Sequence, residues 1–174
     1  MPYLSVEQAC KALRMLAIER SVGRFGGRRS VGSDVLIQTG LDALLAGVDS
    51  PSLPLLAGLG RTEEPEASEL FDAVISELSL GTDLPQDPAS TRWALIEWWA
   101  QLVVDGELAP HEGGLLIWHD GWTELDNPTS LQDIVGWTSE WDDWNDGWDE
   151  PREYFEQRVA DACREFLASR RLEE

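Results

Sequence analysis

Lysine is nearly absent from this sequence, in which Lys11 is the only one among 174 residues. Thirteen basic residues stand against 33 acidic ones, so the formal net charge is −20. The first sixty residues hold six basic and five acidic side chains, so the whole excess of negative charge lies after them. Nucleic acid phosphates and anionic membrane surfaces bind proteins through lysine and arginine. The composition therefore argues against direct nucleic acid or membrane binding and favours a basic protein partner.

Cysteine and long apolar runs are also scarce. The two cysteines, Cys10 and Cys163, lie near opposite ends of the chain on apolar helical stripes, so we expect buried free thiols rather than a disulfide. No run approaches the roughly 18 apolar residues of a membrane-spanning helix, and the first residues lack the pattern of a secretory signal. We therefore expect a cytoplasmic protein.

Signatures of catalysis are missing as well. The two histidines, His111 and His119, are eight residues apart, which matches no H-E-x-x-H zinc motif and would place them about 80° apart on a helix. No nucleophile elbow, reactive-cysteine signature or dinucleotide fingerprint occurs. We expect no catalytic residues, no metal and no cofactor, and a metal-dependent enzyme using His111 and His119 is the least favoured alternative.

Residues 88–104, PASTRWALIEWWAQLVV, predict the helix around which the chain is built. Asp87 offers an N-cap oxygen, Pro88 suits the first turn, and polar side chains are confined to one narrow stripe. A helix that is apolar nearly all round belongs inside a domain, where its tryptophans can each bury roughly 150–250 Å².

The remaining periodic segments predict further helices. Their ranges are 6–19, 34–46, a short segment within 50–59, 63–79, 108–119, 128–144 and 150–171. We expect Ser5 and Gln8 to form a capping box before the helix at 6–19, and Ser33 and Thr62 to be the N-caps of the helices at 34–46 and 63–79. Gly47 should end the helix at 34–46. No segment alternates like a strand. The fold class predicted is all-α: a compact single-domain bundle, residues 1–174, of about seven to eight short helices around a buried Trp-rich central helix.

Three stretches interrupt the helical pattern. Residues 20–33, rich in glycine and arginine, predict a mobile loop, and the alternative is an arginine patch that contacts an acidic surface, that of this same chain included. Its glycines at 27 and 32 have the spacing of a phosphate-binding loop, but the lysine and the preceding strand are missing. Residues 121–127 predict a turn, and Gly113 with Gly114 weakens the prediction of a helix there.

Residues 134–156 form an acidic, Trp-rich face. Ile134, Trp137, Trp141, Trp144 and Trp148 recur at steps of three and four, so a continuous helix would align them, whereas eight acidic residues are accompanied only by Arg152. Folding does not require such a density of like charge, which costs roughly a few tenths of a kcal/mol per close pair. The candidate partner-binding residues are Glu140, Trp141, Asp142, Asp143, Trp144, Asp146, Trp148, Asp149 and Glu150.

Two other interpretations of this face stay open. The tryptophans can all be core residues, with the acids merely solvating the opposite face. A calcium loop fits poorly, because starting it at Asp142 places Trp144 at the third ligand position, and starting it at Asp143 brings Gly147 one place early.

The block WWAQLVVDGELAPHEGGLLIWHDGW, followed by GWTSEWDDW, resembles small acidic helical proteins of GC-rich bacteria that look like immunity proteins. The resemblance implies a cytosolic inhibitor that occupies a basic surface or active site of a toxin, and it carries over no functional residues. The alternative is an acidic chaperone or adaptor for a secreted or biosynthetic partner. The oligomeric state does not follow from the sequence.

Overall fold

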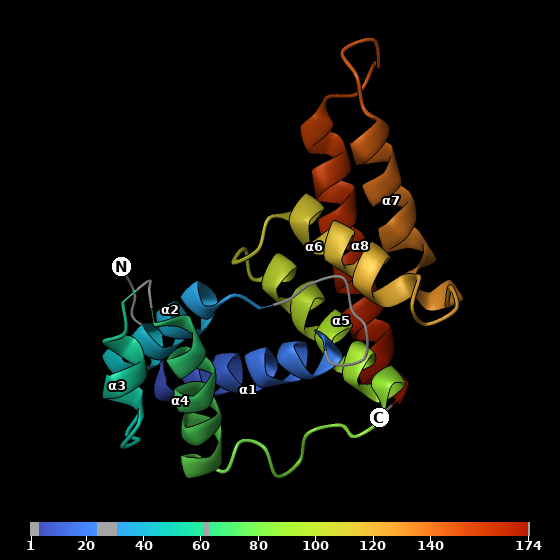
Figure 1. Cartoon of the computed structure of the whole chain (residues 1–174). Helices are drawn as coiled ribbons and strands as arrows, with labels where there is room; N and C mark the ends of the chain where they lie inside the picture. The colour runs from blue at the N-terminus through green and yellow to red at the C-terminus, as the bar shows by residue number, and fades with distance from the viewer. Residues whose placement is uncertain (1–3, 24–30, 61–62, 174) are drawn as a thin grey trace. The chain divides into compact units, whose positions relative to one another are not determined.

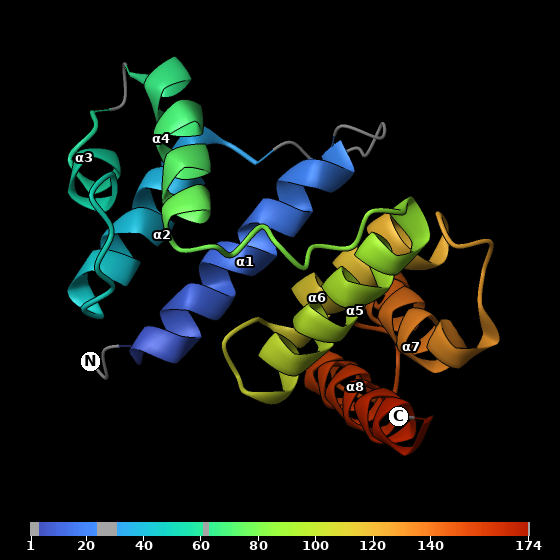
Figure 2. The same cartoon turned by 90° about the horizontal axis from the view of Figure 1, so that it is seen from below.

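The computed structural model describes residues 4–23, 31–60 and 63–173, which divide into two compact units, residues 1–91 and residues 92–174 (Figure 1) (Figure 2). Each unit is described by itself. The described residues form eight α-helices with a π-helical turn and a 3-10 turn, and they include no strand. The predicted all-α class is therefore confirmed. That the whole chain is a single domain stays a prediction.

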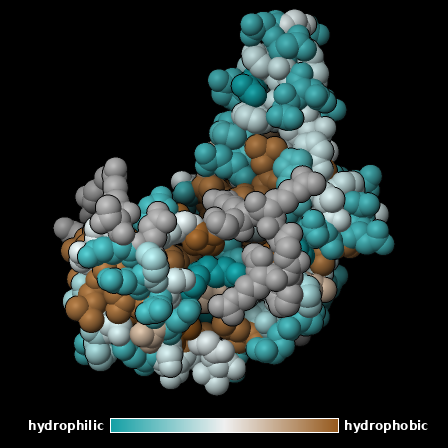
Figure 3. Space-filling model, viewed as in Figure 1, coloured by the Kyte–Doolittle hydropathy of each residue, from teal (hydrophilic) through white to brown (hydrophobic). Residues whose placement is uncertain are grey.

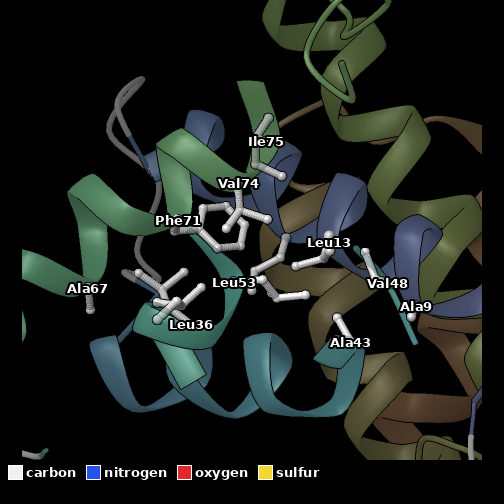
Figure 4. Close-up of a cluster of buried hydrophobic side chains, with 12 residues drawn as sticks. Ala9, Leu13, Leu36, Ala43, Val48, Leu53, Ala67, Phe71, Val74 and Ile75 are labelled. Atoms are coloured by element: carbon white, nitrogen blue, oxygen red, sulfur yellow. The ribbon is translucent and has the colours of Figure 1, made fainter. Parts of the chain in front are cut away.

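The first unit consists of four helices around an apolar core. They are α1 (Val6–Gly23), α2 (Ser33–Leu45), α3 (Leu53–Ala57) and α4 (Glu64–Glu77). Figure 4 shows side chains from all four elements converging, with Phe71 of α4 near the middle. Phe71, Leu13 and Leu53 are fully buried. Burying such side chains is the main favourable term in forming this unit.

Local caps set several of these helix ends as predicted. Ser5 and Gln8 form the capping box, since the Ser5 amide donates to Gln8 Oε1 at 2.9 Å and the Gln8 amide donates to Ser5 Oγ at 3.1 Å. Gly47 follows α2 with a φ of +90°, a conformation that favours glycine. Ser33 is instead the first residue of α2, after an N-cap at Gly32. The predicted cap Thr62 lies outside the described residues.

The last turn of α1 extends into the stretch predicted as a loop. Arg20 donates to Asp72 at 2.7 Å and to Ser68 at 2.5 Å, and its guanidinium lies 5.1 Å from the Phe71 ring centre. These contacts with α4 hold a turn that the glycine-rich sequence would not favour alone. Residues 24–30, the middle of the predicted loop, lie outside the described residues.

Glu77 links the end of α4 to the start of α3. Its carboxylate accepts hydrogen bonds from the hydroxyls of Ser50 and Ser52 and, at 3.0 Å, from the Ser52 amide. These bonds favour the charged form and lower the pKa of Glu77, with Ser50 contributing most. The Ser52 amide, at the N-terminal end of α3, thereby gains an anionic hydrogen-bond partner.

The second unit contains the helix predicted as central. Its elements are α5 (Pro88–Val104, whose first turn belongs to the first unit), α6 (Pro110–Leu116), the π-helical turn η1 (Ile117–Trp122), the 3-10 turn η2 (Thr129–Leu131), α7 (Gln132–Asp143) and α8 (Arg152–Glu173). The bounds of α5 agree with the prediction. Trp99 is buried, and Trp93 and Trp98 are half-buried.

Two adjacent glycines let α6 approach two other helices closely. A Cβ atom at Gly113 would overlap the Val103 side chain of α5, and one at Gly114 would overlap the Thr138 side chain of α7. Both glycines are buried. Their cost in helix propensity is thus offset by close packing, which the local sequence pattern does not report.

The predicted turn at residues 121–127 begins later than expected, because the chain continues α6 as the π-helical turn η1. Arg92, only 6% exposed, donates to the Asp120 carbonyl at 2.7 Å, and its charge lies 3.7 Å from Glu124. The buried Arg92 thus supplies the Asp120 carbonyl, within the wider π turn, with a charged hydrogen-bond donor. Asp126 and Asn127, both with positive φ, then reverse the chain.

The close contact at Gly114 generates a prediction. Gly114→Ala should destabilise the protein by about 1–3 kcal/mol, because the added methyl group must displace Thr138. Gly136→Ala on α7 is the matched control, since a Cβ there meets no atom within 4 Å, and it should raise stability by up to about 1 kcal/mol. Urea denaturation measures both. Equal effects of the two changes would contradict the packing role of Gly114.

The cap of α5 predicts a dependence on pH. Asp87 Oδ1 accepts from the Ser90 amide at 2.9 Å, and this bond lowers the pKa of Asp87 below its ordinary value of 3.8. The resulting stabilisation is present above the unfolded-state pKa and is lost as pH falls through the lower folded-state pKa. Asp87→Asn keeps a cap but does not titrate. Thermal midpoints from pH 7 to 2.5 should therefore fall more steeply for the native protein, and parallel curves would contradict this assignment.

Candidate functional site

The acidic, Trp-rich face lies at one end of the hairpin formed by α7 and α8. Helix α7 carries Glu140 to Asp143 and then stops, because Trp144 adopts extended backbone with φ −58° and ψ 140°. Asn145 Oδ1 accepts from the Gly147 amide at 3.0 Å, which builds a turn of residues that disfavour helix. A continuous helix would align all four tryptophans, but because the chain leaves the helix here, Trp144 and Trp148 lie beyond the face that α7 carries. We call residues 144–151 the acidic loop.

Two tryptophans brace the acidic loop. Trp144 Nε1 donates to the Glu150 carbonyl at 2.9 Å across the loop. The Trp148 ring meets Phe155 of α8 edge to face, with 5.4 Å between ring centres. Such aromatic pairs are worth about 0.5–1.5 kcal/mol beyond their buried area. Trp144 therefore links the two ends of the loop, and Trp148 ties the loop to α8.

Trp141 lies between the ring of a histidine and the guanidinium of an arginine. His111 of α6 stacks on it at 4.3 Å with planes 8° apart, and the Arg152 guanidinium lies 3.9 Å from its centre. Two planar groups this close to one ring centre cannot share a face, so they cover opposite faces. Arg152 also lies 5.8 Å from Trp144. The only basic residue among these acids thus contacts aromatic rings rather than carboxylates.

Trp137 completes the aromatic row one turn earlier on α7. Its ring packs against Tyr154 and Phe155, each with 6.4 Å between centres, and the Arg158 guanidinium lies 4.4 Å from its centre. Trp137, Trp141, Trp144 and Trp148 are all half-buried. The tryptophans are therefore neither core residues nor free surface anchors, and each presents only part of its ring to solvent.

Of the eight carboxylates of this face, the six on the end of α7 and on the acidic loop are, in contrast, exposed. They belong to Glu140, Asp142, Asp143, Asp146, Asp149 and Glu150. None of these six side chains has an ion pair or hydrogen bond with any residue that the structure describes. Some carboxylates elsewhere are paired, as in the contact of Arg170 with Glu97 at 2.6 Å. In Figure 3 hydrophilic colouring accordingly covers the loop end of the hairpin.

The two histidines contact different residues. His111 Nδ1 lies 2.8 Å from Glu156 Oε1 of α8, while His119 is exposed and stacks on Trp118 at 4.8 Å. Among the described residues no group of three or more histidine, cysteine, aspartate or glutamate side chains is arranged to hold a metal ion.

The cysteines offer little as nucleophiles. Both are free, as the sequence predicts, and Cys163 is buried whereas Cys10 is half-buried. Burial raises the pKa of the Cys163 thiol to about 12, so the reactive thiolate is scarce at neutral pH. Helices long and apolar enough to cross a membrane are likewise missing from the part of the chain that the structure describes.

Sequence reasoning named the acids and tryptophans but missed the residues that position them. His111 of α6 and Arg152 of α8 meet Trp141 only in the folded hairpin, where Glu156 contacts His111. One signal was available: a single arginine among eight acids and several tryptophans is a strong candidate for a cation–π contact.

Comparisons of the chain with protein-family models, with curated proteins and with solved structures found no match. The chemistry of the acidic, Trp-rich face therefore carries the functional argument.

The indole nitrogens of Trp141 and Trp144 predict different responses to the same change. Trp141 Nε1 is buried without a hydrogen-bond partner, whereas Trp144 Nε1 donates to the loop. Trp141→Phe removes an unsatisfied donor and keeps a stacking ring, so unfolding free energy should change by less than about 1 kcal/mol. Trp144→Phe loses a bond worth about 1 kcal/mol as well as ring area, so it should destabilise more. Urea titration measures both, and the reverse order would contradict these assignments.

Proposed function

We propose that this protein is an acidic protein-binding module that acts as an immunity-type inhibitor, neutralising a cationic toxin or enzyme partner. The observation that carries the proposal is the set of six exposed carboxylates that have no partner among the described residues, on and beside a loop that tryptophans hold. The proposal places the protein in the cytoplasm, in keeping with two free cysteines.

The distribution of charge supports a partner rather than a purely structural role. Like charges within about a Debye length, 10 Å at 0.1 M salt, repel one another and slightly destabilise the fold. A basic surface placed against the loop would replace this repulsion with attraction and would accelerate encounter. The net charge of −20 disfavours nucleic acid and anionic membranes as the alternative occupant.

The braced loop supports binding to a folded surface. Trp144 and Trp148 hold the backbone on which Asp146, Asp149 and Glu150 are carried. A loop already held in one conformation loses less entropy on association than a flexible acidic tail would. The exposed parts of the half-buried tryptophans add apolar area near the carboxylates, and aromatic residues are enriched in protein interfaces.

Neutralising the loop end tests the proposal. Asp142→Asn, Asp143→Asn and Asp146→Asn together should slow association with the partner about tenfold at low salt and flatten its salt dependence, because exposed charges act mainly on encounter rates. The partner is first isolated by low-salt capture from the native host on the unchanged protein. Stopped-flow or surface kinetics at two salt concentrations then measure the rate.

The matched control removes the same charge elsewhere. Glu66, Glu69 and Asp83 are exposed acids of the first unit, and their amide variants should associate at the native rate. Loss of the partner's toxic or enzymatic activity at one equivalent supports an inhibitor, whereas an acidic chaperone would leave the folded partner active. Identical association rates for both triple variants, at both salt concentrations, would contradict the proposal and would mean that the loop end is only solvated surface.

A further inference from the structure

A cavity of about 260 Å³ opens in the second unit between the start of α7 and the second half of α8. It lies at the opposite end of the hairpin from the acidic loop, so it is separate from the surface discussed above. Ligand pockets for small molecules typically measure about 300–1,000 Å³, and this volume suits a smaller ligand.

The inner wall of the cavity is apolar. Phe166 and Ala162 of α8 and Ile134 of α7 are all buried and line it. Trp93 of α5 adds an aromatic side, with its ring 6.4 Å from that of Phe166 and nearly parallel to it. This surface can take the hydrocarbon part of a ligand, and contact with it removes apolar area from water.

The positive charge at the cavity is already compensated. Arg170 contacts Glu97 at 2.6 Å and Glu173 at 3.6 Å, and its guanidinium lies 5.1 Å from the Trp93 ring centre. Arg170 therefore occupies the face of Trp93 and two carboxylates at once. It offers no surplus charge to an anionic ligand.

Two further carboxylates line the same cavity without a cation. Asp133 on α7 and Glu165 on α8 are exposed, and among the described residues neither side chain has an ion pair or hydrogen bond. The cavity thus joins an apolar wall to a mouth with uncompensated negative charge. A ligand with a short hydrocarbon chain and one cationic head matches both parts.

We propose that this cavity binds an alkylammonium group, with its hydrocarbon chain against Phe166, Ala162 and Ile134 and its ammonium head between Asp133 and Glu165. An ammonium fits better than a guanidinium, because Arg170 already covers the aromatic face on which a planar guanidinium would stack. A free alkylamine and a lysine side chain share this chemistry. The site goes beyond the proposed inhibitor function, and a negative result for either proposal leaves the other unaffected.

Titration of the full chain with n-butylammonium chloride tests the site by ¹H–¹⁵N NMR at constant ionic strength. The amides of Ser130, Ala162 and Ser169 should shift with saturation at roughly 1–10 mM, the affinity expected for about five non-hydrogen atoms. The neutral isostere n-butanol and the planar n-propylguanidinium should bind at least about fivefold more weakly. N-acetyl-lysine methylamide distinguishes the sources: saturation assigns the site to a lysine side chain, and failure beside saturation by n-butylammonium assigns it to a free amine.

Variants supply the decisive comparison. Asp133→Asn with Glu165→Gln should weaken n-butylammonium binding about fivefold or more, and each single variant should weaken it partly. Asp142→Asn with Asp143→Asn removes the same charge at the other end of the hairpin and should leave the affinity unchanged. Linear shifts without saturation, equal binding of n-butanol, or equal loss in both double variants would overturn the proposal. Far-ultraviolet circular dichroism verifies that each variant is folded, and the single variants carry the test if the double variant is not.

Discussion

The absence of two side chains, those of Gly113 and Gly114, determines how the second unit packs. Because no Cβ intervenes, α6 touches Val103 of α5 on one side and Thr138 of α7 on the other. This placement brings His111, at the start of α6, onto the ring of Trp141 and within 2.8 Å of Glu156. A bulkier residue at either glycine would separate these helices, and the stacked arrangement beside the acidic loop depends on their closeness.

Several arginines of the described residues pair with carboxylates or lie over aromatic rings. Arg20 ties α1 to α4, and Arg170 pairs with Glu97. Arg152 lies over Trp141 although its neighbours in the sequence are acidic. Among the described residues the six acids at the hairpin end therefore have no cationic partner, and an external one is the simplest physical means of compensating them.

The hairpin of α7 and α8 thus has two chemically different ends. At one end, aromatic rings hold a loop with exposed carboxylates, which suits a broad basic protein surface. At the other, Asp133 and Glu165 line a cavity whose inner wall is apolar, which suits a single cationic group with a short hydrocarbon chain. Both ends carry an excess of acids over bases, but their shapes suit different partners. An exposed loop can contact a protein surface, whereas a cavity can hold a side chain or a small molecule.

The sequence by itself determined the helices and several of their ends, since caps and apolar periodicity act over three or four residues. It predicted α5 from Pro88 to Val104, the capping box of Ser5 and Gln8, and the turn at Gly47. The end of α7 lies within one residue of the helix predicted over 128–144, but the step of three and four continues through Trp144 and Trp148, so the positions of these two side chains beyond the helix were not predicted. Tertiary structure alone decided which tryptophan faces are covered, why the paired glycines of α6 are tolerated, and that residues as distant as Trp93 and Phe166 share a cavity. Each of these depends on contacts between elements far apart in the chain, which no local pattern records.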